Sequence, residues 1–119
     1  MTHTVSVYGS LKQGFGNHRL INQEPVTTGQ TSEESFAMYS LGGFPGVLHG
    51  GEDAIQVEVY EVDDETFDRL DALEGHPHFY KRERTAISGE DGITYHAWMY
   101  IFMHPVSENA YVEGGEWHV

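Results

Sequence analysis

The alternation of hydrophobic and polar positions predicts that β-strands make up most of this chain. The clearest strand spans residues 54–62, where β-forming side chains alternate with Gln56 and Glu58, which point to the opposite face. Shorter apolar-leaning runs predict further strands at residues 4–8, 26–31, 35–41, 79–87 and 93–103. The last two runs flank residues 88–92, whose Gly, Glu and Asp residues favour a hairpin turn.

Glycine-rich segments interrupt this pattern. Residues 9–17 hold three glycines and no long apolar run, which predicts a loop, and residues 18–22 predict a short helical turn. Residues 42–46 are rich in Gly and Pro and predict a break between strands. The tail from residue 105 onward has no clear pattern, so it predicts no particular element.

One helix is well marked, directly after the clearest strand. Asp63 is a good N-cap residue, acidic residues in the first turn suit the helix dipole, and Val62 can pack on Phe67 as a hydrophobic staple. An apolar stripe runs from Phe67 to Leu73, and Gly75 fits the position just after the helix. Strands with one clear helix predict an α+β fold with a curved or barrel-like sheet, formed as a single domain over residues 1–119.

Composition excludes several classes of partner. The net charge of −13 disfavours nucleic acid and anionic membrane surfaces, because both need clustered Lys and Arg. No apolar run approaches the ~18–20 residues that span a bilayer, and the N-terminal residues lack the pattern of a signal peptide. The absence of Cys removes disulfides and thiolates, so we expect a cytoplasmic protein. Its acidity fits either simple solubility or a high-salt cytoplasm.

The positive charges are unevenly placed. Residues 1–23 contain two basic residues and no acid, and a second group lies within one predicted strand; together they are Lys12, Arg19, Lys81, Arg82 and Arg84. These cations could prepare a local site for a small carboxylate. The alternative is that both stretches are ordinary solvated surfaces.

Glu74 is the first candidate for chemistry. It is the last polar residue of the predicted helix, where the negative end of the helix dipole disfavours a carboxylate. Burial beside Leu73 and Phe79 would raise its pKa further, towards the range useful for a general base. The competing interpretation is a solvated residue at a helix end, which is the common situation for Glu.

The loop Tyr8-Gly9-Ser10-Leu11 is the second candidate. A strand that ends in this sequence exposes backbone N–H groups in a tight turn. Such groups, together with a hydroxyl, can bind a carboxylate or a developing oxyanion. Taken alone the signal is weak, because Gly-Ser turns are common.

The eight histidines invite a metal interpretation, above all His76-Pro77-His78. However, no HExxH pattern or clustered acid–His spacing supports a site, so surface histidines are expected. A phosphate-binding loop lacks its lysine pattern, and the Gly-x-Ser-x-Gly motif of serine hydrolases is absent. We therefore expect neither a metal nor another cofactor.

Together these segments resemble the gamma-glutamyl cyclotransferase family, also called AIG2-like, and most closely its gamma-glutamylamine cyclotransferase branch and small bacterial relatives. The resemblance is carried by the loop Tyr8-Gly9-Ser10-Leu11 and by Leu70-Asp71-Ala72-Leu73-Glu74-Gly75 with a later Tyr80. The segments that match in family order are residues 7–12, 17–18, 43–46, 57–63, 70–77, 80–82 and 97–100.

The resemblance implies a small mixed β-barrel with outer helices and a cavity lined by the loop. It implies that Glu74 is the general acid and base, that Tyr8, Gly9, Ser10 and Leu11 grip a gamma-glutamyl group, and that Tyr80 lines the pocket. The implied reaction cyclises a small gamma-glutamyl amide to 5-oxoproline and releases an amine. Two alternatives stay open: a binding module for an amino acid or peptide on the same fold, and an enzyme for another glutamylated small amide.

Overall fold

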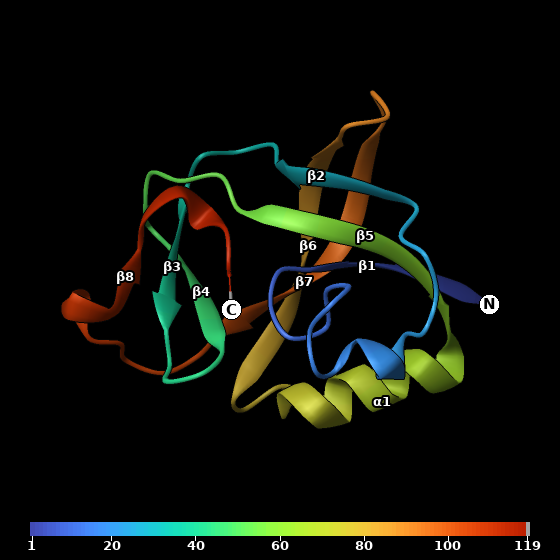
Figure 1. The fold of residues 1–119 in the computed structure, drawn as a ribbon, viewed down its shortest axis with the longest axis horizontal. Coiled ribbons are helices and arrows are strands. Elements are labelled where there is room, and N and C mark those ends of the chain that lie inside the picture. Colours follow the sequence, from blue (N-terminus) through green and yellow to red (C-terminus); the bar gives the residue numbers. More distant parts are fainter. Residues whose placement is uncertain (119) are drawn as a thin grey trace.

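Five strands close into a barrel in the computed structural model, which describes residues 1–118 (Figure 1). Around the barrel they follow the order β1 (Thr2–Val7), β5 (Gln56–Asp63), β2 (Thr27–Thr31), β6 (Tyr80–Gly89) and β7 (Thr94–Phe102). Neighbouring strands pair antiparallel except at the closure, where β1 and β7 run parallel and Val5 pairs with Trp98. The expected mixed barrel is confirmed.

A small second sheet stands beside the barrel (Figure 1). Its order is β4 (Pro45–His49), β3 (Phe36–Ser40) and β8 (Tyr111–Val112). Strand β4 corrects the sequence analysis, which predicted only a break at residues 42–46. Pro45 begins this strand opposite Ser40, and β4 lies at the edge of its sheet, where the missing N–H of proline is tolerated.

The helix α1 (Asp64–Glu74) has the ends that its sequence predicts. The Asp63 side chain accepts a hydrogen bond from the Thr66 N–H at 2.8 Å, and Gly75 ends the helix with a φ of 65°. Short 3₁₀ turns occur at His18–Leu20, Glu108–Ala110 and Glu113–Gly115. No helix within residues 1–118 is long and apolar enough to cross a membrane.

The hydrophobic core has two parts, one on each face of the curved sheet. Strand β5 contributes Val57 and Val59 to one part and Tyr60 and Val62 to the other. Strand β7 alternates in the same way, because successive side chains of a strand point to opposite faces. The second part includes Leu70 of α1, so burial of the apolar stripe holds the helix against the barrel and fixes where its C-terminal end lies.

Candidate active site

One pocket of about 370 Å³ opens where α1 ends against the barrel. Residues from β1 and the loop after it, from the β3–β4 turn, from α1, from the start of β6 and from β7 meet there. The lining residues are Ser6, Val7, Tyr8, Gly9, Ser10, Leu11, Asn17, Gly43, Phe44, Pro45, Leu73, Glu74, Phe79, Tyr80 and Tyr100. All the site residues named from the sequence are in this set.

Glu74 is the last residue of α1, and its side chain is half-buried in the pocket wall. Among residues 1–118, its carboxylate has no hydrogen-bond partner and no salt bridge. Burial therefore goes uncompensated and raises the pKa of Glu74 from its ordinary 4.5 to about 7. A carboxyl group with this pKa can both accept and return a proton near neutral pH.

Within residues 1–118, the loop that follows β1 is held through its carbonyl groups and the Ser10 hydroxyl, not through its first N–H groups. The Lys12 N–H donates to the Gly9 carbonyl at 3.0 Å, and the Asn17 N–H donates to the Ser10 carbonyl at 2.9 Å. Asn17 also donates from its side chain to the Ser10 hydroxyl at 2.9 Å. In the described part of the chain, the N–H groups of Gly9, Ser10 and Leu11 donate to no other residue. They are available to an anion or an oxyanion in the pocket.

Gly9 allows this loop to approach the β3–β4 turn closely. A Cβ at residue 9 would lie 2.9 Å from Cγ of Pro45, which is closer than carbon atoms normally approach. The carbonyl of Pro45 also accepts a hydrogen bond from the Tyr80 hydroxyl at 2.7 Å. The turn is thus fixed between the loop and β6.

Buried tyrosines form the inner wall. The Tyr8 hydroxyl donates to the carbonyl of Tyr100 at 2.7 Å, as the Tyr80 hydroxyl does to Pro45. Burial is the main cause that raises the pKa of Tyr8 and of Tyr80, and the nearby Glu74 carboxylate raises both further. Both phenols therefore stay neutral and serve as a rigid wall.

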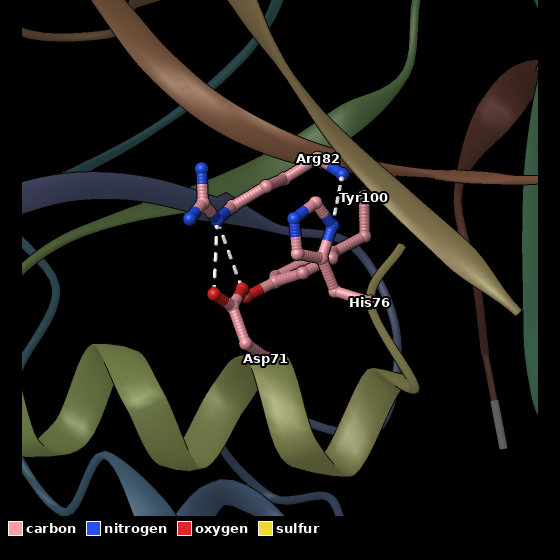
Figure 2. Close-up of polar contacts among 4 residues, drawn as sticks. All are labelled: Asp71, His76, Arg82 and Tyr100. Atoms are coloured by element: carbon pink, nitrogen blue, oxygen red, sulfur yellow. Dashed lines mark hydrogen bonds and ion pairs between the residues drawn. The ribbon is translucent and has the colours of Figure 1, made fainter. Parts of the chain in front are cut away.

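A cluster of polar contacts centred on Asp71 adjoins the pocket at Tyr100 (Figure 2). Its carboxylate accepts from Nε of Arg82 at 2.9 Å and from the Tyr100 hydroxyl at 2.7 Å. His76 accepts from the Arg82 backbone N–H at 3.3 Å. Tyr100 belongs both to this cluster and to the pocket, so the cluster ties α1 to β6 and β7 beside Glu74.

The expected contribution of cations to the pocket is wrong. Within residues 1–118, no Lys or Arg lines it. Lys12 donates to the carbonyl of Trp117 at 2.9 Å, and Arg82 is bound to Asp71. Arg84 donates to the carbonyl of His96, and its guanidinium lies over the ring of Trp98. The sequence shows that these cations fall in two short segments, but it does not show which group each side chain contacts in the fold.

The histidines of the His76-Pro77-His78 segment are separated in their contacts. The ring of His76 accepts from Arg82, whereas His78 contributes its carbonyl to a contact with the His104 ring. In the residues that the structure describes, no group of three or more His, Asp or Glu side chains could hold a metal ion.

Several pocket residues were given no role from the sequence, notably Asn17, Phe44 and Tyr100, and Phe79 was expected only to help bury Glu74. Phe44 lies between Gly43 and Pro45, and a large aromatic side chain between two breakers is a signal that could have marked it. Tyr100 lies on a strand whose alternation shows which face it occupies but not what that face meets.

Comparison with known proteins agrees with this geometry. The family described as gamma-glutamyl cyclotransferase, AIG2-like, matches residues 5–119. A relative from Methanocaldococcus jannaschii is 40% identical over 116 residues, covering 95% of this chain and 93% of the relative. The gamma-glutamylcyclotransferase family protein YtfP of Escherichia coli strain K12 is 35% identical over 114 residues, covering 95% and 94%.

Solved structures give the same result. The crystal structure of an AIG2-like protein from Mus musculus has a TM-score of 0.79 and 25% identity, covering 95% of this chain and 87% of that one. The solution structure of YtfP from Escherichia coli has a TM-score of 0.64 and 35% identity, covering 96% and 95%. The chain therefore belongs to the AIG2-like gamma-glutamyl cyclotransferase family.

Proposed function

We propose that this protein is an enzyme that cyclises a gamma-glutamyl amide, releasing an amine and forming 5-oxoproline. The observation that carries the proposal is Glu74, a carboxyl group with a pKa of about 7 and no partner among residues 1–118, in a pocket where the same residues leave backbone donors free. Membership of the family supports a reaction of this type.

In the proposed reaction, the α-amine of the gamma-glutamyl group attacks its own side-chain carbonyl carbon. The new carbon–nitrogen bond closes the ring, and the carbon–nitrogen bond of the amide breaks. Glu74 takes a proton from the substrate ammonium and returns one to the departing amine. The pocket contributes by holding a flexible substrate in the one conformer from which the ring can close. This lowers the entropic part of the activation free energy.

The loop supplies the complementary donors. We assign the N–H groups of Gly9, Ser10 and Leu11 to the substrate carboxylate or to the oxyanion that develops on the attacked carbonyl. Tyr8 and Tyr80 form the wall against which the gamma-glutamyl group packs. Since no Lys or Arg of the described residues lines the pocket, these backbone groups carry the recognition of negative charge.

The pocket also supports our proposal that residues 1–119 act as one domain. Its lining comes from the barrel, from the turn of the second sheet at Phe44 and Pro45, and from α1 at Leu73 and Glu74. Removing any of these parts would open the site.

Incubation with a panel of gamma-glutamyl compounds, followed by detection of 5-oxoproline, tests the proposal. We expect stoichiometric 5-oxoproline and free amine from at least one compound. Binding without any product would instead favour a binding module on this fold. Release of an amine without 5-oxoproline would favour the processing of another glutamylated amide.

A further inference from the structure

The pocket changes character from its interior to its mouth. Its inner residues are buried and include Ser6, Tyr8 and Tyr100, with 1%, 5% and 4% of their surfaces exposed. At its mouth, Phe44 and Leu73 are 40% and 43% exposed. Phe79, also a lining residue, is 41% exposed. We call Phe44, Leu73 and Phe79 the apolar mouth.

Leu73 and Phe79 of this mouth lie beside Glu74, and Phe44 lines the same pocket. Leu73 precedes Glu74 on α1. Phe79 stands at the end of that helix, because a Cβ on Gly75 would lie 3.0 Å from Cβ of Phe79. Phe44 precedes Pro45, whose carbonyl is bound by Tyr80. A substrate whose gamma-glutamyl group is bound by the N–H groups of residues 9–11 would place its other end, beyond the scissile amide, among these hydrocarbon side chains.

Charged groups are scarce at this mouth. Glu74 is the single charged side chain lining the pocket within residues 1–118. The ring of His104 packs behind Phe79 at 5.7 Å, but its Nε2 is engaged with the carbonyl of His78. A charged substituent packed against these half-exposed hydrocarbon side chains would lose part of its hydration, and Glu74 would be its only charged partner among the described lining residues, which is unfavourable. An anionic one would also meet the field of a chain with net charge −13.

We propose that the amine released from the substrate carries an uncharged, apolar alkyl or arylalkyl group, which packs in the apolar mouth. This inference rests on the proposed function and names its substrate class. Exposed hydrophobic side chains lining a pocket gain free energy when a ligand covers them. Selectivity for the amine thus comes from Phe44, Leu73 and Phe79, whereas the loop Tyr8-Gly9-Ser10-Leu11 recognises the part common to all gamma-glutamyl amides.

Pairs of gamma-glutamyl amides that differ only in charge test this inference. The pentylamide is matched by the 4-aminobutylamide, and the isobutylamide is matched by gamma-glutamylglycine. We expect the apolar member of each pair to have at least tenfold higher kcat/KM. From the methylamide to the pentylamide, kcat/KM should rise by up to about fourfold per methylene, as expected for burial of hydrocarbon.

Variants locate the effect. Leu73→Ser should lower the pentylamide-to-methylamide ratio of kcat/KM several-fold, because it removes hydrocarbon from the mouth. Ile93→Ser is the matched control: Ile93 is 54% exposed but lies in the turn between β6 and β7 and does not line the pocket. It should leave that ratio unchanged. Leu73→Lys should raise the relative rate with gamma-glutamylglycine, because it supplies the missing cation.

The outcomes separate this inference from the proposed reaction. Formation of 5-oxoproline with a preference for the charged member of either pair would overturn the inference and leave the reaction standing. Binding of the same amides to Glu74→Gln, followed by calorimetry, gives a measure that is independent of turnover. An apolar preference in Kd without any 5-oxoproline would reject the reaction but keep the apolar mouth. If the protein neither bound these amides nor turned them over, both the inference and the proposed reaction would be overturned.

Discussion

Asp71 and Glu74 lie about one turn apart on α1, yet their carboxylates differ in hydrogen-bonding partners and in the direction of their pKa shifts. Both are half-buried. Asp71 accepts hydrogen bonds from Arg82 and Tyr100 (Figure 2), whereas the carboxylate of Glu74 has no such partner among residues 1–118. Burial would raise the pKa of Asp71, but the bonds from Arg82 and Tyr100 and the Arg82 charge lower it overall. For Glu74, burial acts alone and raises the pKa to about 7.

The comparison shows how one helix provides both support and reactivity. The guanidinium of Arg82 lies 4.5 Å from the ring centre of Phe67 and 4.6 Å from that of Trp98, so Asp71 faces a cation that is itself held in place. An ionised, bonded carboxylate is a poor proton acceptor, but it fixes geometry well. An unpaired carboxyl group with a pKa near neutrality has the reverse properties.

The largest expected effect comes from removing the basicity of Glu74. Glu74→Gln keeps the shape of the side chain, so we expect kcat to fall by ~10²-fold or more while the affinity for a substrate analogue changes far less. Steady-state formation of 5-oxoproline, with calorimetric titration of the analogue, measures both.

Glu65→Gln serves as the matched control for this change. Glu65 lies on the same helix, is exposed, and pairs with Arg69 one turn later. Its kcat should equal that of the unchanged protein. If Glu74→Gln retained near-normal turnover, another group would have to move the proton.

The second effect is the dependence of kcat/KM on pH. Glu74 must be ionised to accept a proton, and its pKa in the free enzyme is about 7. Activity should therefore fall about tenfold per pH unit below this value. Asp71, whose pKa lies below its ordinary 3.8, should contribute no limb in this range. A profile that stays flat from pH 8 down to pH 5 would contradict the role of Glu74.

The third effect concerns stability and breaks the Asp71 side of the comparison. Asp71→Asn leaves Arg82, which is 22% exposed, without its anion, and we expect unfolding to become easier by about 1–3 kcal/mol. Glu65→Gln breaks a pair whose side chains are 59% and 72% exposed and should cost less than about 0.5 kcal/mol.

Urea denaturation at pH 8 compares these variants. Adding Arg82→Met to Asp71→Asn should recover part of the loss, because the double variant leaves no unpaired charge. If Asp71→Asn were no less stable than Glu65→Gln, the cluster would not support the end of α1.

The two carboxylates also show what sequence reasoning can reach. The position of Glu74 was predictable, because Asp63 and Gly75 mark both ends of the helix by local rules. The partner of Asp71 was not predictable, since Arg82 reaches it only through the path of the chain from the helix into β6. From the sequence, Arg82 could either have helped to prepare a carboxylate site or have lain on a solvated surface, and the structure instead pairs it with Asp71.

The same division holds for the fold. Alternating patterns located the barrel strands to within a few residues, because burial on one face is a local signal. Closure of the barrel pairs Val5 with Trp98, which depends on the register of strands far apart in sequence. Strand β4 was missed because it begins at Pro45 in a segment rich in breakers, and only its edge position makes that acceptable.

The smallest expected effect is a gain in stability from losing Glu74. The pKa of this residue rises from 4.5 to about 7 on folding, so the folded state binds more protons than the unfolded state between these values. The free energy of unfolding therefore decreases as pH rises through that window. Glu74→Gln has no such term and should be about 1–2 kcal/mol more stable than the unchanged protein at pH 8, since access to the open pocket reduces the full effect.

At pH 4, both proteins carry a neutral side chain at residue 74, so their stabilities should agree. Asp71 contributes with the opposite sign: its pKa is lowered on folding, so its stabilisation is present above its ordinary 3.8 and is lost as pH falls through the lower folded value. Chemical denaturation of Glu74→Gln and Asp71→Asn across pH 3–8 separates these windows. A stability difference for Glu74→Gln that did not grow between pH 4 and pH 8 would mean that the carboxyl group of Glu74 is ordinary, and the contrast with Asp71 would disappear.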